Sequence, residues 1–175
     1  AIVQDLLTLA RRGVAISGIV NLNAIVSEYL KSPEYDKLIS FHSKVKLETH
    51  FESDLLNMTG SQVHLSKTIM NLVSNAAESM PDGGKIIITT KNQYIDTPVG
   101  NYHAVEEGDF CVLTISDTGI GISPEDLEKI FEPFYTKKVM GRSGTGLGMA
   151  VVWGTVKDHN GYIDMQSSKG KGTVF

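Results

Sequence analysis

The sequence lacks the features that mark a secreted, membrane-spanning or nucleic-acid-binding protein. Its single cysteine, Cys111, cannot form an intramolecular disulfide, so the composition suits a reducing cytoplasm. No apolar run approaches the ~20 residues that cross a bilayer, and no signal peptide is found at the N-terminus. Basic residues do not predominate: 16 Lys and Arg face 20 Asp and Glu, a net charge of −4, which argues against non-specific binding to nucleic acid. We therefore expect a cytoplasmic location, with any membrane anchor elsewhere in a longer protein.

What is present is an ordinary globular composition. Hydrophobic residues make up 41% and charged residues 21% of the 175 positions, which argues against a mainly disordered chain and predicts a folded domain. The sequence shows no internal repeat and no low-complexity segment. Because it begins in the middle of a helical pattern and ends in an apolar run, we expect it to be a fragment.

The periodicity of the apolar residues predicts a mixture of helices and strands. Helices are expected at residues 2–12, 22–30, 61–80 and 146–159, with a short one opening at residue 123. Strands are expected at residues 45–51, 86–90 and 110–116, and a terminal hairpin from residues 162–166 and 173–175. Two strands are joined by a polar loop around residues 98–108 and not by a helix. The expected fold is therefore an α/β two-layer sandwich, a mixed β-sheet covered on one face by helices.

The glycines are unevenly distributed. Of the 17 glycines, 11 lie from Gly108 onward, and most of these fall in residues 117–122 (DTGIGI), 141–150 (GRSGTGLGMA) and 170–175 (GKGTVF). Clustered glycine marks places where the backbone bends sharply or approaches a ligand closely.

One face of the 61–80 helix carries polar side chains at i+3 and i+4 spacing. They are His64, Lys67, Asn71, Asn75 and Glu78. Asparagine is a poor residue for a helix interior, because its amide competes with the backbone. The row is either a solvated face or a site at which the amide oxygen of Asn75 binds Mg²⁺, with Asn71 beside it.

Asp117 ends an expected strand and is followed by Gly119 and Gly121. A carboxylate here can accept from the amino group of adenine, while the glycines let a flat ring lie against bare backbone. An ordinary turn aspartate is the alternative. Asp-Thr-Gly also occurs in aspartic proteases, but that chemistry needs two carboxylates sharing a proton and the chain has one copy.

Residues 144–148 (GTGLG) precede an apolar helix, where free backbone N–H groups and the helix dipole favour an anion such as phosphate. Lys137, Lys138 and Arg142 lie just upstream and could add positive charge. Glycine density predicts a lid over residues 132–145; a flexible loop that binds nothing is the alternative. The segment fits neither the P-loop pattern nor a dinucleotide fingerprint.

Taken in order, these motifs resemble the catalytic, ATP-binding domain of sensor histidine kinases, within the GHKL superfamily. The N box resembles residues 64–79, the G1 box residues 117–122, the F box residues 131–138, the G2 box residues 144–152, and the last glycine-threonine element residues 170–175. The resemblance covers roughly residues 40–175 and implies the sandwich fold of that superfamily, with ATP and Mg²⁺ as ligands.

The resemblance also implies a role for each matching residue. Asn75 would hold Mg²⁺, and Asn71 would contact the phosphates or the water shell of the metal. Asp117 would accept from the adenine amino group, directly and through a water shared with Thr173. The remaining implied nucleotide contacts are Gly119, Gly121, Ile122, Ile130, Phe131, Thr136, Lys137, Gly144, Thr145, Gly146, Leu147 and Gly148. The resemblance implies that Asn71 and Lys138 are catalytic residues. It also implies that Phe131 and Phe134 anchor the two ends of the lid, although packing in the core would explain both phenylalanines equally well.

Two departures from the superfamily matter. Where its chaperone and mismatch-repair ATPases have a glutamate base, this chain has Asn71, which favours transfer of phosphate to a protein over hydrolysis. Where many members have Lys or Arg three residues after the metal asparagine, this chain has Glu78, so the lid must meet the phosphate charge.

The resemblance implies a histidine kinase of a two-component phosphorelay. The sequences of the motifs resemble those of hybrid histidine kinases. None of His42, His50, His64, His103 and His159 is followed by an acidic residue, so the phosphoacceptor histidine is absent. Residues 1–30 would be a remnant of the dimerisation hairpin and its connecting helix, and residues 31–175 the catalytic domain. Its partners would be the hairpin of its own longer chain and a response-regulator receiver domain. The alternatives are an ATP-driven conformational switch and a catalytically silent nucleotide-binding module.

Overall fold

The computed structural model describes residues 18–96, 105–136 and 145–175, so the helix expected at residues 2–12 lies outside the described residues. The helices are α2 (Leu22–Tyr29), α3 (Pro33–Phe41), α4 (Gln62–Glu78), α5 (Pro124–Leu127) and α6 (Gly148–Asp158). The strands are β1 (Ile19–Val20), β2 (Val45–His50), β3 (Met58–Thr59), β4 (Gly84–Ile95), β5 (Gly108–Asp117), β6 (Gln166–Ser168) and β7 (Gly172–Val174). Within this part of the chain, no helix is both long and apolar enough to span a bilayer.

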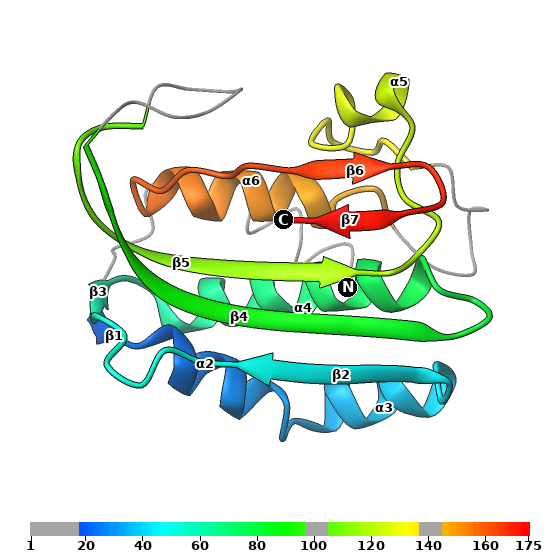
Figure 1. Ribbon diagram of the computed structural model, residues 1–175, viewed down its shortest axis with the longest axis horizontal. Coiled ribbons are helices and arrows are strands. Elements are labelled where there is room, and N and C mark those ends of the chain that lie inside the picture. The colour runs from blue at the N-terminus through cyan, green and yellow to red at the C-terminus, as the bar shows by residue number, and fades with distance from the viewer. Residues whose placement is uncertain (1–17, 97–104, 137–144) are drawn as a thin grey trace.

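Five strands form the main sheet, in the order β2-β4-β5-β7-β6 (Figure 1). Strand β2 runs parallel to β4, and the other neighbouring pairs are antiparallel. The short strands β1 and β3 pair separately. The sheet is therefore mixed, as expected, and β4 and β5 are the two long strands that pair with each other in it.

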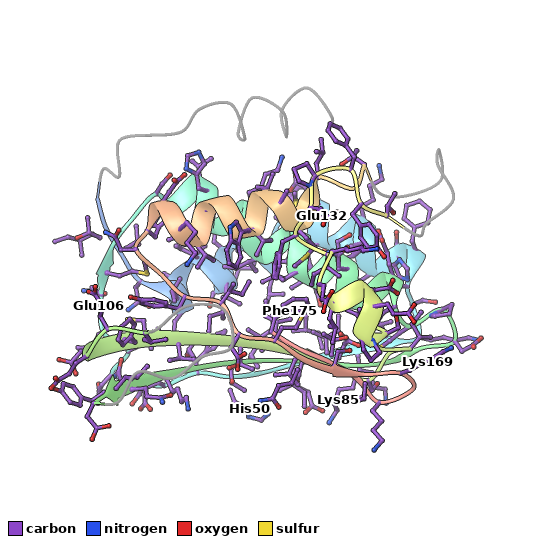
Figure 2. All side chains as sticks on the ribbon, turned by 90° about the horizontal axis from the view of Figure 1, so that it is seen from above. His50, Lys85, Glu106, Glu132, Lys169 and Phe175 are labelled. Carbon is purple, nitrogen blue, oxygen red and sulfur yellow. The ribbon has the colours of Figure 1, made fainter. Side chains whose placement is uncertain are left out.

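The helices α2, α4 and α6 lie on one face of the main sheet, and no other described helix or strand covers the opposite face, called the open face below (Figure 2). Alternate residues of β4, among them Ile86 and Ile88, are buried against this helical layer. They meet the apolar stripe of α4, which includes Ile69 and Val73. The two-layer sandwich predicted from the sequence is confirmed.

Helix α4 begins directly after Ser61, the N-cap residue that the sequence predicts. The Ser61 hydroxyl accepts from the His64 N–H at 3.4 Å, and the side chains buried along the helix recur at three- and four-residue spacing. The helix thereby presents its other face, with Asn71 and Asn75, away from the core.

Three elements differ from the expectation. Ser32 and Pro33 do end the preceding helix, but they also begin α3, because the Ser32 hydroxyl accepts from the Tyr35 N–H at 3.2 Å. Strand β4 continues to Ile95, well beyond residue 90, because β5 pairs with it along its whole length. The terminal hairpin forms from β6 and β7, so the expected first strand at 162–166 was placed too early.

The core has no break at residue 30, where the sequence placed a domain boundary. Leu22, Ile25, Val26 and Tyr29 of α2 belong to the same buried cluster as β4 and α4. Residues 18–30 are thus part of the sandwich, and the assignment of residues 1–17 to a hairpin stays a prediction.

A partly buried link joins α4 to α6 at the end away from Asn75. The imidazole Nδ1 of His159 lies 2.7 Å from the Thr155 carbonyl and its Nε2 lies 2.9 Å from the Ser61 N–H. A carbonyl can only accept, so Nδ1 carries the proton and Nε2 accepts from Ser61. The ring also packs on Gly60, where an added Cβ would lie 2.9 Å from it.

Substitution His159→Ala should lower the free energy of unfolding by about 1–2 kcal/mol, because the Ser61 N–H at the start of α4 loses its acceptor. Urea denaturation followed by circular dichroism measures the change. His50→Ala is the matched control, since His50 lies on the open sheet face with its side chain 65% exposed. Equal midpoints for the two variants would contradict the structural role of His159.

Candidate functional site

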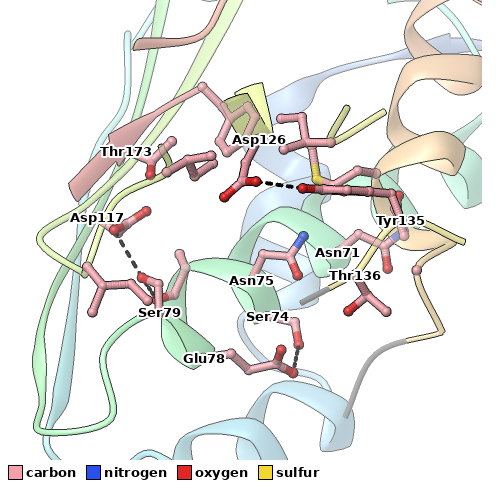
Figure 3. Close-up of a pocket in the computed structure, with 18 of the residues that line it drawn as sticks. Asn71, Ser74, Asn75, Glu78, Ser79, Asp117, Asp126, Tyr135, Thr136 and Thr173 are labelled. Carbon is pink, nitrogen blue, oxygen red and sulfur yellow. Dashed lines mark hydrogen bonds between the residues drawn. The ribbon is translucent and has the colours of Figure 1, made fainter. Parts of the chain in front are cut away.

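A cavity of about 640 Å³ opens between α4, the end of β5, the loop that contains α5, and the start of α6 (Figure 3). It is lined by Lys67, Met70, Asn71, Ser74, Asn75, Ala76, Glu78, Ser79, Asp117, Ile120, Gly121, Ile122, Asp126, Ile130, Tyr135, Thr136, Thr145, Gly146, Gly148, Met149, Thr173 and Phe175. Its volume falls within the range of small-molecule sites. Segments far apart in the sequence therefore converge on one pocket.

Asp117 lies at one side of this pocket, at the last position of β5. Its Oδ1 accepts from the Gly119 N–H at 2.8 Å and from the Ser79 hydroxyl at 3.1 Å. Burial raises the pKa of the Asp117 carboxyl, while hydrogen bonds from Gly119, Ser79 and the Thr173 backbone act in the opposite direction. Because Oδ1 is engaged on the protein side, the carboxylate is held as a fixed acceptor at the pocket wall.

Thr173 lies beside Asp117, since the two residues are register partners between β5 and β7. Its hydroxyl is 2.9 Å from the Ser167 hydroxyl, which also donates to the Gly172 carbonyl at 2.9 Å and accepts from the Ile122 N–H at 2.8 Å. Ser167 thus ties together the hairpin and the loop after β5. The polar pair of Asp117 and Thr173 has a rigid support.

The glycines after Asp117 lie against other protein atoms. A Cβ on Gly119 would lie 1.9 Å from the Ser79 Oγ. Gly121 has φ of +67°, and a Cβ there would lie 2.1 Å from the Ser168 carbonyl oxygen. Close approach of neighbouring chain segments therefore explains both glycines. Of the two, Gly121 lines the pocket, and the approach of a ligand ring to it stays a prediction.

Asn71 and Asn75 extend from α4 into the pocket, one turn apart (Figure 3). The Asn71 Nδ2 donates to the carbonyl of Gly148, the first residue of α6, at 3.2 Å. This bond fixes the orientation of the Asn71 amide, whose oxygen can act as an acceptor. The amide of Asn75 and the carboxylate of Glu78 supply the hard oxygen atoms that suit Mg²⁺. Among the described residues, no cluster of three His, Cys, Asp or Glu could hold a metal by itself, so the donor set fits an ion that also uses ligand oxygens.

The start of α6 closes another side of the pocket. Gly146 has φ of +68°, and a Cβ there would meet the Phe134 backbone at 2.6 Å. The Phe134 N–H donates to the Gly146 carbonyl at 2.9 Å, so the segments on either side of residues 137–144 are joined. The first N–H groups of a helix such as α6 have no partner within the helix and favour an anion.

Most of the predicted site residues that the structure describes do meet in this one pocket. They are Asn71, Asn75, Asp117, Gly121, Ile122, Ile130, Thr136, Thr145, Gly146, Gly148 and Thr173. Lys137, Lys138, Arg142 and Gly144 lie outside the described residues.

Gly119, Phe131 and Leu147 do not line the pocket, although the sequence named them as nucleotide contacts. The Phe131 ring packs on Trp153 of α6, with ring centroids 5.1 Å apart. Leu147 is fully buried and its N–H donates to the Thr145 hydroxyl at 3.2 Å. The exposed Phe134 side chain anchors nothing in the core; its backbone makes the link to Gly146.

Sequence reasoning gave no role to several polar pocket residues, among them Ser79, Tyr135 and Asp126. Ser79 follows Asn75 by one turn, and this spacing was the signal that could have identified it. The Tyr135 hydroxyl donates to Asp126 Oδ1 at 2.6 Å, which joins the segment before residue 137 to α5. No local pattern distinguishes these two residues from surface positions.

Comparison with known proteins places this geometry in a family. Residues 60–175 match the model of the histidine kinase-, DNA gyrase B-, and HSP90-like ATPase family. Sensor kinase CckA of Brucella abortus is 33% identical over 176 aligned positions, covering 100% of this chain and 18% of that protein. Sporulation kinase A of Bacillus subtilis is also 33% identical, covering 99% of this chain and 26% of that protein. The chain thus spans about a quarter or less of the length of these two relatives.

Solved structures share the fold. The mycobacterial sensor histidine kinase MprB matches with a TM-score of 0.67 at 22% identity, covering 90% of this chain and 92% of that one. Full-length ShkA, in complex with AMPPNP, matches with a TM-score of 0.72 at 22% identity, covering 99% of this chain and 34% of that one. The chain belongs to the histidine kinase-, DNA gyrase B- and HSP90-like ATPase family, as an ATP-binding catalytic domain of the histidine kinase type.

Proposed function

We propose that this chain binds Mg·ATP in the pocket and presents the γ-phosphoryl group to a histidine on a dimerisation hairpin of its longer protein. The observation that carries the proposal is that Asp117, Asn75 and the start of α6 all line one cavity. The full-length relatives are named sensor or sporulation kinases, and the ShkA structure contains AMPPNP.

The base would bind at the Asp117 side. The Asp117 carboxylate accepts from the adenine amino group, and Thr173 shares a water with it. Ile122 and Ile130 supply apolar walls for the purine ring. A purine that lacks the amino group leaves the buried acceptor without a donor, which is the physical basis of selection.

The triphosphate would lie along Asn71, Asn75 and the N-terminal end of α6. Free N–H groups in the first turn of α6 donate to phosphate oxygens. The amide oxygen of Asn75 holds Mg²⁺, which when bound neutralises charge on the phosphates. Lys137, Lys138 and Arg142 add positive charge from the lid in this proposal.

The reaction would be a transfer of one phosphoryl group. The bond between the γ-phosphorus and the bridging oxygen breaks, a bond from phosphorus to an imidazole nitrogen forms, ADP leaves, and the imidazole loses a proton. Asn71 orients the phosphates through its amide, whose nitrogen is already held by Gly148. An amide cannot accept a proton from water as a carboxylate base does, so hydrolysis is disfavoured.

The isolated chain should bind one Mg·ATP and form no phosphohistidine, because none of its five histidines is followed by an acidic residue. Incubation with γ-labelled ATP, followed by assay for acid-labile phosphate, tests this. Adding the dimerisation hairpin of the longer protein should yield label on the hairpin together with ADP.

Three other outcomes would oppose the proposal. Stoichiometric phosphohistidine on the isolated chain would place the acceptor within these residues. Steady ADP release without an acceptor would favour the ATP-driven switch. Tight nucleotide binding without transfer to the hairpin would favour the silent module.

A further inference from the structure

One face of α6 begins inside the pocket and continues beyond it. Met149, in the first turn, lines the pocket, whereas Trp153 and Lys157, which follow at four-residue intervals, do not. Residues four apart on a helix lie on the same face. The Trp153 side chain is partly buried, and the Lys157 ammonium lies 4.9 Å from the centre of its ring. Trp153 therefore lies one turn beyond the pocket, on the face of α6 that enters it.

A second chain segment lies against this face of α6. It follows α5, and two adjacent residues in it have different surroundings. Ile130 lines the pocket, and Phe131 packs on Trp153 with the ring centroids 5.1 Å apart and the ring planes at 42°. This separation is within the range of favourable aromatic pairs. Ile130 is thus joined, through the next residue, to a side chain of a regular helix.

The segment that contains Ile130 has no regular structure of its own, whereas α6 is firmly placed. Residues 128–136 include no helix or strand. A turn segment lacks the repeating backbone hydrogen bonds of a helix or a sheet, so side-chain contacts decide its position. In α6, Val151 and Val152, directly before Trp153, are fully buried. The tryptophan ring is therefore a fixed surface against which the turn segment can be held.

We propose that Trp153 is a positioning residue of the nucleotide pocket, because through Phe131 it holds Ile130 as an apolar wall against the purine ring. The inference rests on the proposed function and deepens it, since it names a residue outside the pocket that sets the affinity for the base. Trp153 acts on the part of the ligand that ATP and ADP share. Its loss should therefore weaken the binding of both nucleotides alike.

Calorimetric titration with Mg·ATP and with Mg·ADP tests this in Trp153→Ala, Phe131→Ala and the double variant, after circular dichroism has shown each to be folded. Each single substitution should raise both dissociation constants about tenfold. The double variant should bind little more weakly than either, because every one of these variants lacks the same contact. Trp153→Phe retains an aromatic ring and should bind within about threefold of the unaltered chain. Phe131→Ala, which alters a turn, tests the contact even if Trp153→Ala does not fold.

Tyr162→Ala is the matched control. The Lys157 ammonium lies 5.5 Å from the centre of the Tyr162 ring, and this ring packs on Phe110 of β5. Tyr162 does not line the pocket. The substitution removes an aromatic ring that contacts the same lysine, so it should lower the free energy of unfolding and leave both dissociation constants unchanged.

The possible results separate this inference from the proposed function. If folded Trp153→Ala and Phe131→Ala bind both nucleotides as tightly as the unaltered chain, the ring contact serves packing alone and the inference is overturned. Losses that add in the double variant, a loss confined to Mg·ATP, or an equal loss in Tyr162→Ala would also overturn it. No binding of Mg·ATP by the unaltered chain would overturn the proposed function, and this inference with it.

Discussion

Substitution Asp117→Asn should weaken ATP binding by at least about 100-fold while the chain stays folded. The asparagine oxygen can still accept from Gly119 and Ser79, as Asp117 Oδ1 does at 2.8 and 3.1 Å. Its nitrogen then faces the pocket, so a donor meets the amino group of adenine, also a donor. Calorimetry with Mg·ATP measures the loss.

The same substitution should leave the unfolding midpoint at pH 7 unchanged or higher. Burial raises the pKa of Asp117 above its unfolded value, so the folded chain holds its proton more tightly than the unfolded one. Stability therefore falls as pH rises through these two values, and the ionised carboxylate costs stability at neutral pH. Asparagine removes that cost because it carries no charge.

Ser79→Ala is the matched comparison for Asp117→Asn. It removes one hydrogen bond to the carboxylate but leaves the acceptor in place, so affinity should fall far less. Binding by Asp117→Asn within about threefold of the unaltered chain would contradict the role of Asp117, as would loss of the fold.

Substitution Gly172→Ala should destabilise the chain by about 3 kcal/mol or more. Gly172 has φ of +85°, and a Cβ there would lie 1.9 Å from the Asp117 carbonyl oxygen. Strand β7 would have to move away from β5, which separates Thr173 from Asp117. Thermal and urea unfolding measure the loss of stability, and nucleotide affinity should fall with it.

Substitutions at two other glycines distinguish the cost of backbone strain from the cost of a steric clash. Gly170 has φ of +78° with nothing within 4 Å of an added Cβ, so Gly170→Ala should cost only about 1 kcal/mol. Gly154 lies inside α6, also with open space, and Gly154→Ala should stabilise the chain by about 0.5–1 kcal/mol. If Gly172→Ala were no less stable than Gly170→Ala, the close packing of β7 on β5 would be contradicted.

The parts of the fold that the sequence predicted are those with strong local signals. Helix α4 has a capping serine and a sustained apolar stripe, and the Asp117 and Gly146 motifs follow or precede regular elements. Helix α3 was missed, although Ser32 and Pro33 carry the same signal that correctly indicated α5. The proline was taken only as the end of the preceding helix.

The features of the fold and the site that the sequence did not predict depend on contacts between distant segments, which local patterns do not encode. Strand β4 extends to Ile95 because β5 pairs with it, and Gly119 is required because Ser79 occupies its side-chain position. Phe131 lies in a motif that implied a nucleotide contact, yet its ring packs on Trp153. In each case the decisive neighbour is more than 10 residues away in the sequence.

The central claim is tested most directly by a crystal structure of the chain grown with AMPPNP and Mg²⁺. The account predicts the adenine amino group within hydrogen-bond distance of Asp117, and the metal ion bound by Asn75 Oδ1 against the phosphates. A nucleotide bound outside this cavity, or one turned so that its phosphates lie against Asp117, would contradict it.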